Sequence, residues 1–183
     1  MSDNEEDLKL IRRIAQGDAR ALEELFQRHG RRLGGYLSRR LQRWELVDEC
    51  YSDVMVATWQ NAARFEEGRI VRAWLFGIAR NKASKCFEHR ARRPDLSAGL
   101  SEDGDWDPPQ DAESGPEQRL VARDKLRWVL KAICDLPPRM REVLELVWID
   151  GLRYTEIGEL LGISPNTVKT RVFHARRRLP PLD

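Results

Sequence analysis

The amino-acid sequence predicts an all-α protein in which two small helical domains are joined by an acidic flexible linker. Apolar residues recur at intervals of three to four through most of the 183-residue chain, and no long stretch alternates with period two. This helical pattern stops over residues 96–118. Net charge changes at the same boundaries: residues 1–95 carry +4, residues 96–118 carry −7 and residues 119–183 carry +5. Such asymmetry is typical of proteins that bind nucleic acid.

Composition excludes several other classes of protein. No apolar run approaches the ~20 residues that a membrane span needs, and the acidic N-terminus lacks the apolar region of a secretory signal. We therefore expect a cytoplasmic protein with no membrane insertion. Cys50, Cys86 and Cys134 form no CxxC pair, so they are expected to be buried, reduced thiols. The three histidines share no ligand spacing, which predicts no metal site and no cofactor.

The first two helices are separated by Gly17. Asp18 is expected to cap the second helix, because a side-chain oxygen at that position accepts from unpaired backbone N–H groups. The apolar stripe of the second helix continues past Gly30 and the pair Gly34 and Gly35, which are weak points in this stretch.

The third and fourth helices are expected over roughly residues 46–63 and 70–91. One set of side chains at helical spacing follows the third helix: Val47, Cys50, Tyr51, Val54 and Thr58. A second set follows the fourth helix: Trp74, Leu75, Ile78, Ala79, Lys82 and Cys86.

Residues 96–118 predict a linker, because Gly, Pro, Ser and acidic residues dominate and apolar surface is too scarce to offset chain entropy. Helical periodicity returns at residue 119 and runs to Ile133. Pro137 and Pro138 end that helix and begin the next. The next helix should end near Gly151, with an apolar stripe of Met140, Val143, Leu144, Val147 and Trp148.

Residues 154–179 predict two further helices joined by a tight turn. Thr155 can cap the first, Gly162 suits its C-terminal turn, and Ser164 followed by Pro165 begins the second. Inner-face residues of the first helix and the corner are Ile157, Leu160, Leu161 and Ile163. Those of the second helix are Val168, Val172, Ala175 and Leu179.

This pattern indicates a helix-turn-helix, since the second helix is basic on its open face and a helix fits the major groove. Side chains on that face would meet base edges, and residues at the helix N-terminus would contact phosphate. The candidate DNA-binding residues are Ser164, Asn166, Thr167, Lys169, Thr170, Arg171, Phe173, His174 and Arg177. An ordinary solvated helical hairpin is the alternative.

A second basic surface is expected on the fourth helix. Asn81 and Lys85 share a face, with Arg72 and Arg80 near it. The interleaved aromatic residues are Phe65, Trp74 and Phe76. Cations beside aromatic side chains suit single-stranded or melted DNA. The alternative is that Trp74 belongs to the core and the charged face is solvated.

The third helix has the opposite charge. Glu45, Asp48, Glu49 and Asp53 form an acidic stripe beside Tyr51 and Ser52, which are expected to be exposed. No His, Cys ligand pair or Lys base accompanies these carboxylates, so they do not make an acid–base site. A protein-docking surface or a plain solvated face fits better.

Taken in order, these motifs resemble bacterial extracytoplasmic-function sigma factors, the small two-domain class of RNA polymerase specificity subunits. The stretches GDARALEELFQRH, DECYSDVMVATW and RAWLFGIARNKA are similar to the family's sigma-2 domain. LPPRMREVLELVWIDGLRYTEIGELLGISPNTVKTRVFHARRRL is similar to its sigma-4 domain almost residue for residue in type. The resemblance covers essentially the full chain.

The resemblance implies a role for each part. Residues 1–95 would dock on core polymerase and read and melt the −10 element, residues 96–118 would thread through the enzyme, and residues 119–183 would read the −35 element. Residues implied to contact the polymerase are Asp48, Glu49, Ser52 and Asp53. Those implied at the −10 element are Phe65, Arg72, Arg80, Asn81 and Lys85, and the loop from Phe65 to Ile70 falls where the family captures a flipped base.

The implied function is a transcription initiation factor without catalytic activity. Its implied partners are the β′ clamp helices and β flap of core RNA polymerase, promoter DNA and an anti-sigma factor. A stand-alone helix-turn-helix regulator of duplex DNA is the main alternative. A small hydrolase is a weaker one, because no nucleophile–base pair, phosphate loop or metal set supports it.

Overall fold

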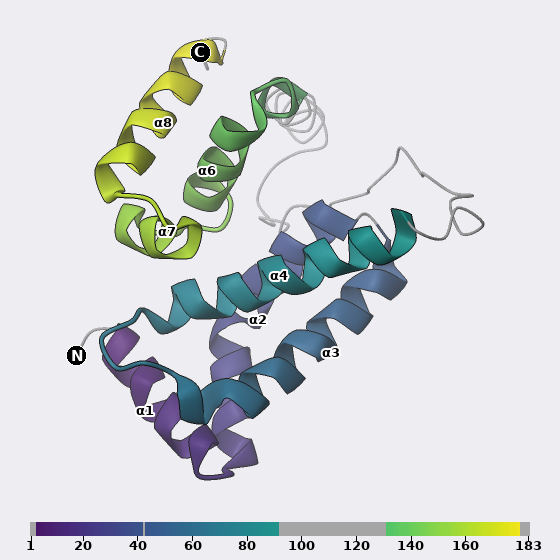
Figure 1. Cartoon of the computed structure of the whole chain (residues 1–183), viewed down its shortest axis with the longest axis vertical. Coiled ribbons are helices and arrows are strands. Elements are labelled where there is room, and N and C mark those ends of the chain that lie inside the picture. Colours follow the sequence, from purple (N-terminus) through teal and green to yellow (C-terminus); the bar gives the residue numbers. More distant parts are fainter. Residues whose placement is uncertain (1–2, 42, 92–130, 180–183) are drawn as a thin grey trace, which may run out of the picture. The chain divides into compact units, whose positions relative to one another are not determined.

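The computed structural model describes residues 3–41, 43–91 and 131–179. Every regular element within these ranges is a helix, which confirms the predicted all-α class (Figure 1). The expected linker, residues 96–118, lies outside the described residues. So does most of the helix expected from residue 119, although its predicted last apolar residue, Ile133, is described and buried.

The described helices fall into two compact units. The first contains α1 (Asp3–Ala15), α2 (Ala19–Leu41), α3 (Trp44–Asn61), the short 3₁₀ helix η1 (Ala62–Arg64) and α4 (Val71–Ala91). The second contains α6 (Pro138–Trp148), α8 (Pro165–Arg178) and the larger part of α7 (Tyr154–Leu161). No described helix has the length and apolar character needed to cross a membrane.

The core of the first unit lies where α2 packs against α1, α3 and α4 (Figure 1). The Tyr36 ring of α2 meets the Phe76 ring of α4 edge to face, with centroids 5.3 Å apart. Burying an aliphatic or aromatic side chain of this size contributes roughly 1.5–3 kcal/mol. Other fully buried side chains here are Ile14, Leu25, Leu33, Leu37, Val54, Val71 and Leu75.

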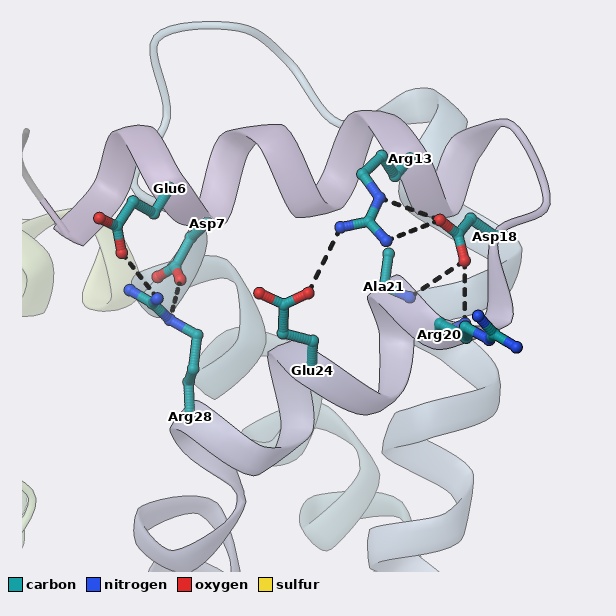
Figure 2. Close-up of polar contacts among 8 residues, drawn as sticks. All are labelled: Glu6, Asp7, Arg13, Asp18, Arg20, Ala21, Glu24 and Arg28. Atoms are coloured by element: carbon teal, nitrogen blue, oxygen red, sulfur yellow. Dashed lines mark hydrogen bonds and ion pairs between the residues drawn. The ribbon is translucent and has the colours of Figure 1, made fainter.

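The junction of α1 and α2 is held by polar contacts (Figure 2). Asp18 caps α2 as predicted: its Oδ1 accepts from the backbone N–H groups of Arg20 at 3.0 Å and Ala21 at 3.3 Å. Arg13 donates from Nε to Asp18 Oδ2 at 2.9 Å, and this hydrogen bond lowers the pKa of the Asp18 carboxyl. Gly17, at φ +88°, makes the turn before the cap.

A second polar cluster joins α1 to α2 half-way along the helices, and sequence reasoning did not find it. Asp7 is 2% exposed. Its Oδ2 is hydrogen-bonded to His29 Nε2 at 2.7 Å, and its Oδ1 forms an ion pair with Arg28 Nε at 3.0 Å. Glu6 pairs with the same arginine at 2.7 Å (Figure 2). A buried carboxylate requires a hydrogen-bond partner and a nearby positive charge of this kind.

Gly30 is a contact point rather than a weak point. A Cβ there would overlap the hydroxyl of Tyr51, whose ring meets Phe26 edge to face at 5.6 Å. The expectation that Tyr51 is exposed is therefore wrong: it is half-buried, and burial raises the pKa of its phenol. The missing side chain at Gly30 lets the tyrosine fold against α2.

Helix α6 of the second unit begins as predicted, with Pro137 at its N-cap and Pro138 in its first turn. The helix ends at Trp148 and the chain turns through Gly151, at φ +62°. Two expectations for its apolar face are wrong. Trp148 is 39% exposed, and Leu146, absent from the predicted stripe, is 1% exposed. Val143 and Leu144 are buried as expected.

The expectation that all three cysteines are buried is also wrong. Cys50 is buried in the first unit, Cys86 is half-buried on α4, and Cys134 is exposed. Cys134 lies in the described helical residues that precede Pro137.

Candidate nucleic-acid interface

The helices α7 and α8 are joined by a turn at Gly162, whose φ of +65° suits glycine as predicted. Ser164 is the N-cap of α8: its Oγ accepts from the backbone N–H of Thr167 at 3.1 Å, and Pro165 follows in the first turn. The predicted start of the second helix is confirmed. Backbone N–H groups at this end give the helix a partial positive charge that suits phosphate.

The predicted start of α7 is wrong by two residues. The helix begins at Tyr154, so Thr155 lies inside it and caps nothing. Arg153 occupies the cap position, since its carbonyl accepts from Ile157 N at 3.0 Å and its N–H donates to the Glu156 carboxylate. Residues 149–153 are enough to turn the chain from α6, so α7 begins at Tyr154, before the predicted cap.

Gly158 explains how α7 comes close to the start of α8. A Cβ at this position would lie 2.8 Å from the Ile163 carbonyl oxygen and 3.5 Å from Pro165. The Ile163 N–H donates to the Gly158 carbonyl at 3.0 Å. Sequence reasoning missed this contact, although a glycine in the middle of a short helix is the signal that could have found it.

The inner face of the helix-turn-helix is partly as predicted. Ile157, Val168, Val172 and Ala175 are buried. The other expected members are half-buried, namely Leu160, Leu161, Ile163 and Leu179. Leu179 follows the last residue of α8, so it packs less completely than residues inside the helix.

The opposite face of α8 carries the candidate −35 residues. Most of them are exposed: Ser164, Asn166, Lys169, Thr170, Phe173, His174 and Arg177. Thr167 and Arg171 are half-buried. Phe173 is 56% exposed, and it is flanked by the His174 ring at 5.5 Å and by the Arg177 guanidinium 5.7 Å from its centroid. One exposed face thus combines cations, hydrogen-bonding groups and an apolar ring, as groove recognition requires.

The candidate −10 residues lie on α4 and just before it. Asn81 and Lys85 are exposed one turn apart, whereas Arg72 and Arg80 are half-buried. Phe65 and Trp74 are half-buried and meet edge to face, with centroids 5.1 Å apart.

Phe76 does not belong to this surface, contrary to the sequence prediction. It is 0% exposed and packs on Tyr36 in the core. The place of a residue in the helical repeat decides whether its side chain faces the core. Phe76 lies on the same side of α4 as Leu75 and Ala79, which are also buried.

The loop from Phe65 to Ile70 is held from α1. Asn4 Oδ1 accepts from the backbone N–H of Val71 at 2.9 Å, and Arg12 pairs with Glu67 at 2.8 Å. Gly68, at φ +97°, supplies the turn within the loop. Sequence reasoning did not identify Asn4, because it precedes the loop by more than sixty residues.

The acidic residues of α3 form one exposed face, as the sequence analysis allowed. Its members are Glu45, Asp48, Glu49, Ser52 and Asp53. Asp53 pairs with Lys82 of α4 at 3.0 Å, which places it at the edge of the face. Val56 and Trp59, 52% and 38% exposed, continue the face toward the C-terminal end of α3. Sequence reasoning did not include these two apolar residues.

Within the three described ranges, no group of three or more His, Cys, Asp or Glu side chains could hold a metal ion. The surfaces instead comprise a basic, hydrogen-bonding face on α8, a polar and aromatic face on α4, and an acidic face on α3. Charged surfaces of this kind bind macromolecules of opposite charge.

Two family models match the chain. One describes Sigma-70 region 2 and matches residues 25–93, and the other describes Sigma-70, region 4 and matches residues 126–179. The RNA polymerase sigma factor NccH of Alcaligenes xylosoxydans xylosoxydans is 32% identical over 182 residues, covering 100% of this chain and 97% of that protein. The ECF RNA polymerase sigma factor ShbA of Streptomyces griseus subsp. griseus is 30% identical and covers 94% of this chain and 93% of that one.

Solved structures resemble the fold. One is a structure of CnrH in complex with the cytosolic domain of CnrY, with a TM-score of 0.66, 29% identity and 94% of each chain covered. A second is the sigma factor RpoE in complex with the anti-sigma factor NepR from Bartonella quintana. That match has a TM-score of 0.62 and 23% identity, and it covers 85% of this chain and 92% of the other.

Proposed function

Because this chain belongs to the sigma-70 family of RNA polymerase sigma factors, we propose that it directs core polymerase to promoters by reading two DNA elements in different states. The −35 element is read as duplex by α8, and the −10 element is read as a separated strand at α4. The observation that carries the proposal is that α8, capped at its N-terminus by Ser164, has an exposed basic and hydrogen-bonding face. The same chain carries the polar and aromatic face of α4.

The −35 contact is argued from the chemistry of α8. Lys169 and Arg177 are exposed cations, and Asn166 and Thr170 are exposed hydrogen-bonding groups on the same face. Ser164 uses its oxygen to cap the helix, so its contribution to DNA is the oriented N-terminus. Side chains in the middle of the helix would meet base edges, and those at its ends would meet phosphates.

The −10 contact is argued from the surface around α4. A separated strand exposes base faces and phosphates together, so it needs aromatic platforms beside cations. The Phe65–Trp74 pair supplies partly exposed rings, and Asn81 and Lys85 supply an amide and a cation on the following turns. The loop from Phe65 to Ile70 is the proposed site for a flipped base.

The acidic face of α3 is proposed to dock on the β′ clamp helices of core polymerase. Like charges repel, so carboxylates at Asp48, Glu49 and Asp53 disfavour DNA and favour a basic protein surface. Val56 and Trp59 would add apolar contact at one end of the same face. The second unit is proposed to contact the β flap.

Further assignments follow from this function. The proposed domains are residues 1–95 and 119–183, with residues 96–118 as the linker between them. We expect the protein to act in the cytoplasm, where polymerase and promoter DNA lie, and no step of the proposed mechanism needs a catalytic residue or a cofactor. CnrH was solved with the cytosolic domain of CnrY, and the sigma factor RpoE was solved with the anti-sigma factor NepR, so an anti-sigma factor is a proposed partner here as well.

The test is multi-round transcription with purified core polymerase, the full chain and a library of genomic promoter fragments. We expect specific transcripts that start downstream of paired −35 and −10 elements and that disappear when the chain is omitted. If the chain directs core polymerase to no genomic promoter, the proposal is wrong.

A binding assay separates the proposal from a stand-alone regulator. A helix-turn-helix regulator shifts duplex promoter DNA without polymerase, whereas the proposed mechanism needs core enzyme to hold both elements in place. We therefore expect specific retention of promoter DNA only when core polymerase is present. Specific retention by the isolated chain alone would favour the regulator.

A further inference from the structure

The helices α3 and α4 pack side by side in opposite directions (Figure 1). Lys82 of α4 donates to Asp53 of α3, with Nζ 3.0 Å from Oδ2. One turn further along this seam, Cys86 lies four residues after Lys82 and Cys50 lies three residues before Asp53. Antiparallel helices in this register bring the two cysteines face to face.

Burial raises the pKa of the Cys50 thiol, and the neighbouring Cys86 thiol across the seam raises it further. The two thiols differ in access to solvent: Cys50 is 1% exposed, and Cys86 is half-buried on the outer side. The sequence showed only two cysteines 36 positions apart, and the packing of α3 on α4 makes them neighbours.

We propose that Cys50 and Cys86 form an oxidation site, at which a hydroperoxide converts the two thiols into an intrachain disulfide across the α3–α4 seam. This inference rests on the contact between the two helices, and it does not depend on the proposed promoter function.

The two sulfurs take different steps of the reaction because they differ in exposure to solvent. The Cys86 sulfur attacks the terminal oxygen of the hydroperoxide, the O–O bond breaks, and the products are a Cys86 sulfenic acid and an alcohol, or water when the oxidant is hydrogen peroxide. The Cys50 sulfur then attacks the sulfenic sulfur, and the S–O bond breaks. The oxygen leaves as water with the Cys50 proton, so two thiols have lost two electrons to one peroxide.

Cys50 is suited to the second step and not to the first. Burial raises the pKa of its thiol to about 12, so at neutral pH it stays protonated and does not compete for peroxide. The packing of α3 on α4, fixed one turn away by the Lys82–Asp53 pair, holds Cys50 beside the sulfenic sulfur once that group forms. Proximity within the fold thus compensates for the low thiolate fraction.

The disulfide would join the helix that carries the acidic face to the helix that carries Asn81 and Lys85. Cross-linking residues 50 and 86 restricts the unfolded chain, so the oxidised first unit should unfold at a higher temperature than the reduced one. Reduction by a dithiol reverses the bond by exchange, restoring both thiols as the dithiol becomes a cyclic disulfide.

The test uses the full chain with a Cys134→Ser substitution, which removes the exposed third thiol and leaves both seam cysteines in place. After treatment with hydrogen peroxide, we expect loss of both free thiols, an intact mass lower by two hydrogen atoms, and a linked peptide pair containing Cys50 and Cys86. Dithiothreitol should restore both thiols. Thermal unfolding under non-reducing conditions should shift to higher temperature.

Two variants assign the steps. In C50S, we expect Cys86 to form a sulfenic acid that no second thiol resolves. Dimedone should trap this sulfenic acid, and without dimedone it should be oxidised further to the sulfinic acid. In C86S, Cys50 should keep its free thiol at the same peroxide dose while the chain stays folded by circular dichroism. Accumulation of Cys86 sulfinic acid beside a free Cys50 in C134S, or disulfides that form only between chains in the wild type, would overturn the proposal.

Discussion

The side-chain oxygen of Asn4, in α1, accepts a hydrogen bond from the backbone N–H of Val71, 2.9 Å away at the first residue of α4. The first N–H groups of a helix have no partner inside the helix. Here the partner comes from a different helix, so one contact both caps α4 and ties the proposed base-capture loop to α1.

We expect Asn4→Ala to lower the free energy of unfolding by about 0.5–2 kcal/mol, the usual cost of losing a helix cap. Asn4→Asp is the matched control, because it keeps an oxygen acceptor and its negative charge is favourable at a helix N-terminus. Urea unfolding followed by tryptophan fluorescence measures both. If the alanine variant is as stable as the aspartate variant, the side-chain cap is not contributing.

The contact between Gly30 and Tyr51 predicts a coupled effect. Gly30→Ala should cost about 1–3 kcal/mol, because the new methyl group overlaps the Tyr51 hydroxyl. In a Tyr51→Phe background the same substitution should cost less, giving a coupling energy above about 0.5 kcal/mol in a double-mutant cycle.

Gly34→Ala is the control in the same helix. No atom lies within 4 Å of a Cβ placed at Gly34, so alanine should raise the free energy of unfolding by about 0.5–1 kcal/mol through helix propensity. Equal effects of the two glycine substitutions would mean that the tyrosine does not restrict Gly30.

The Arg13–Asp18 hydrogen bond predicts a dependence of stability on pH. It lowers the pKa of Asp18 below the usual 3.8, so folding favours the ionised carboxylate. The stabilisation is present above the unfolded-state pKa and is lost as pH falls through the lower folded-state pKa. Arg13→Gln should therefore be less stable than the wild type at pH 6, and the difference should shrink below about pH 4.

Arg20→Gln controls for the loss of a positive charge, because Arg20 binds Asp18 through its backbone N–H and not through its guanidinium. Urea unfolding across this pH range measures all three proteins. Arg13 is exposed and Asp18 is partly exposed, so added salt should also reduce the difference. A wild-type–Arg13→Gln difference that is constant from pH 6 to pH 3 would contradict the assignment.

Lys169 tests the proposed −35 face. In the holoenzyme, Lys169→Ala should weaken promoter binding by about 1–3 kcal/mol and relax the preference at one −35 position if the side chain contacts a base. If it contacts phosphate, binding should weaken for all sequences and the salt dependence should fall. Lys131→Ala, which removes an exposed lysine of the second unit outside α8, should leave −35 preference unchanged. An unchanged affinity for every bound promoter would remove Lys169 from the site.

Much of the local structure follows from short stretches of sequence. The caps at Asp18 and Ser164, the turn at Gly162 and the proline start of α6 are all confirmed. The candidate residues on α3, α4 and α8 were chosen by helical spacing, and most of them are exposed. Apart from the start of α7, the errors concern side chains whose environment depends on a second helix, as for Tyr51, Phe76 and Trp148.

The sequence by itself determined the helical class, the helix caps at Asp18 and Ser164 and the order of basic, acidic and basic segments, because each depends on residues within a few positions of one another. Only the tertiary structure decided which distant residues meet, as in the Asn4–Val71 cap, the Asp7–His29 pair and the Cys50–Cys86 contact. The physical reason is that periodicity defines a face of a helix, whereas the register between packed helices decides what that face touches.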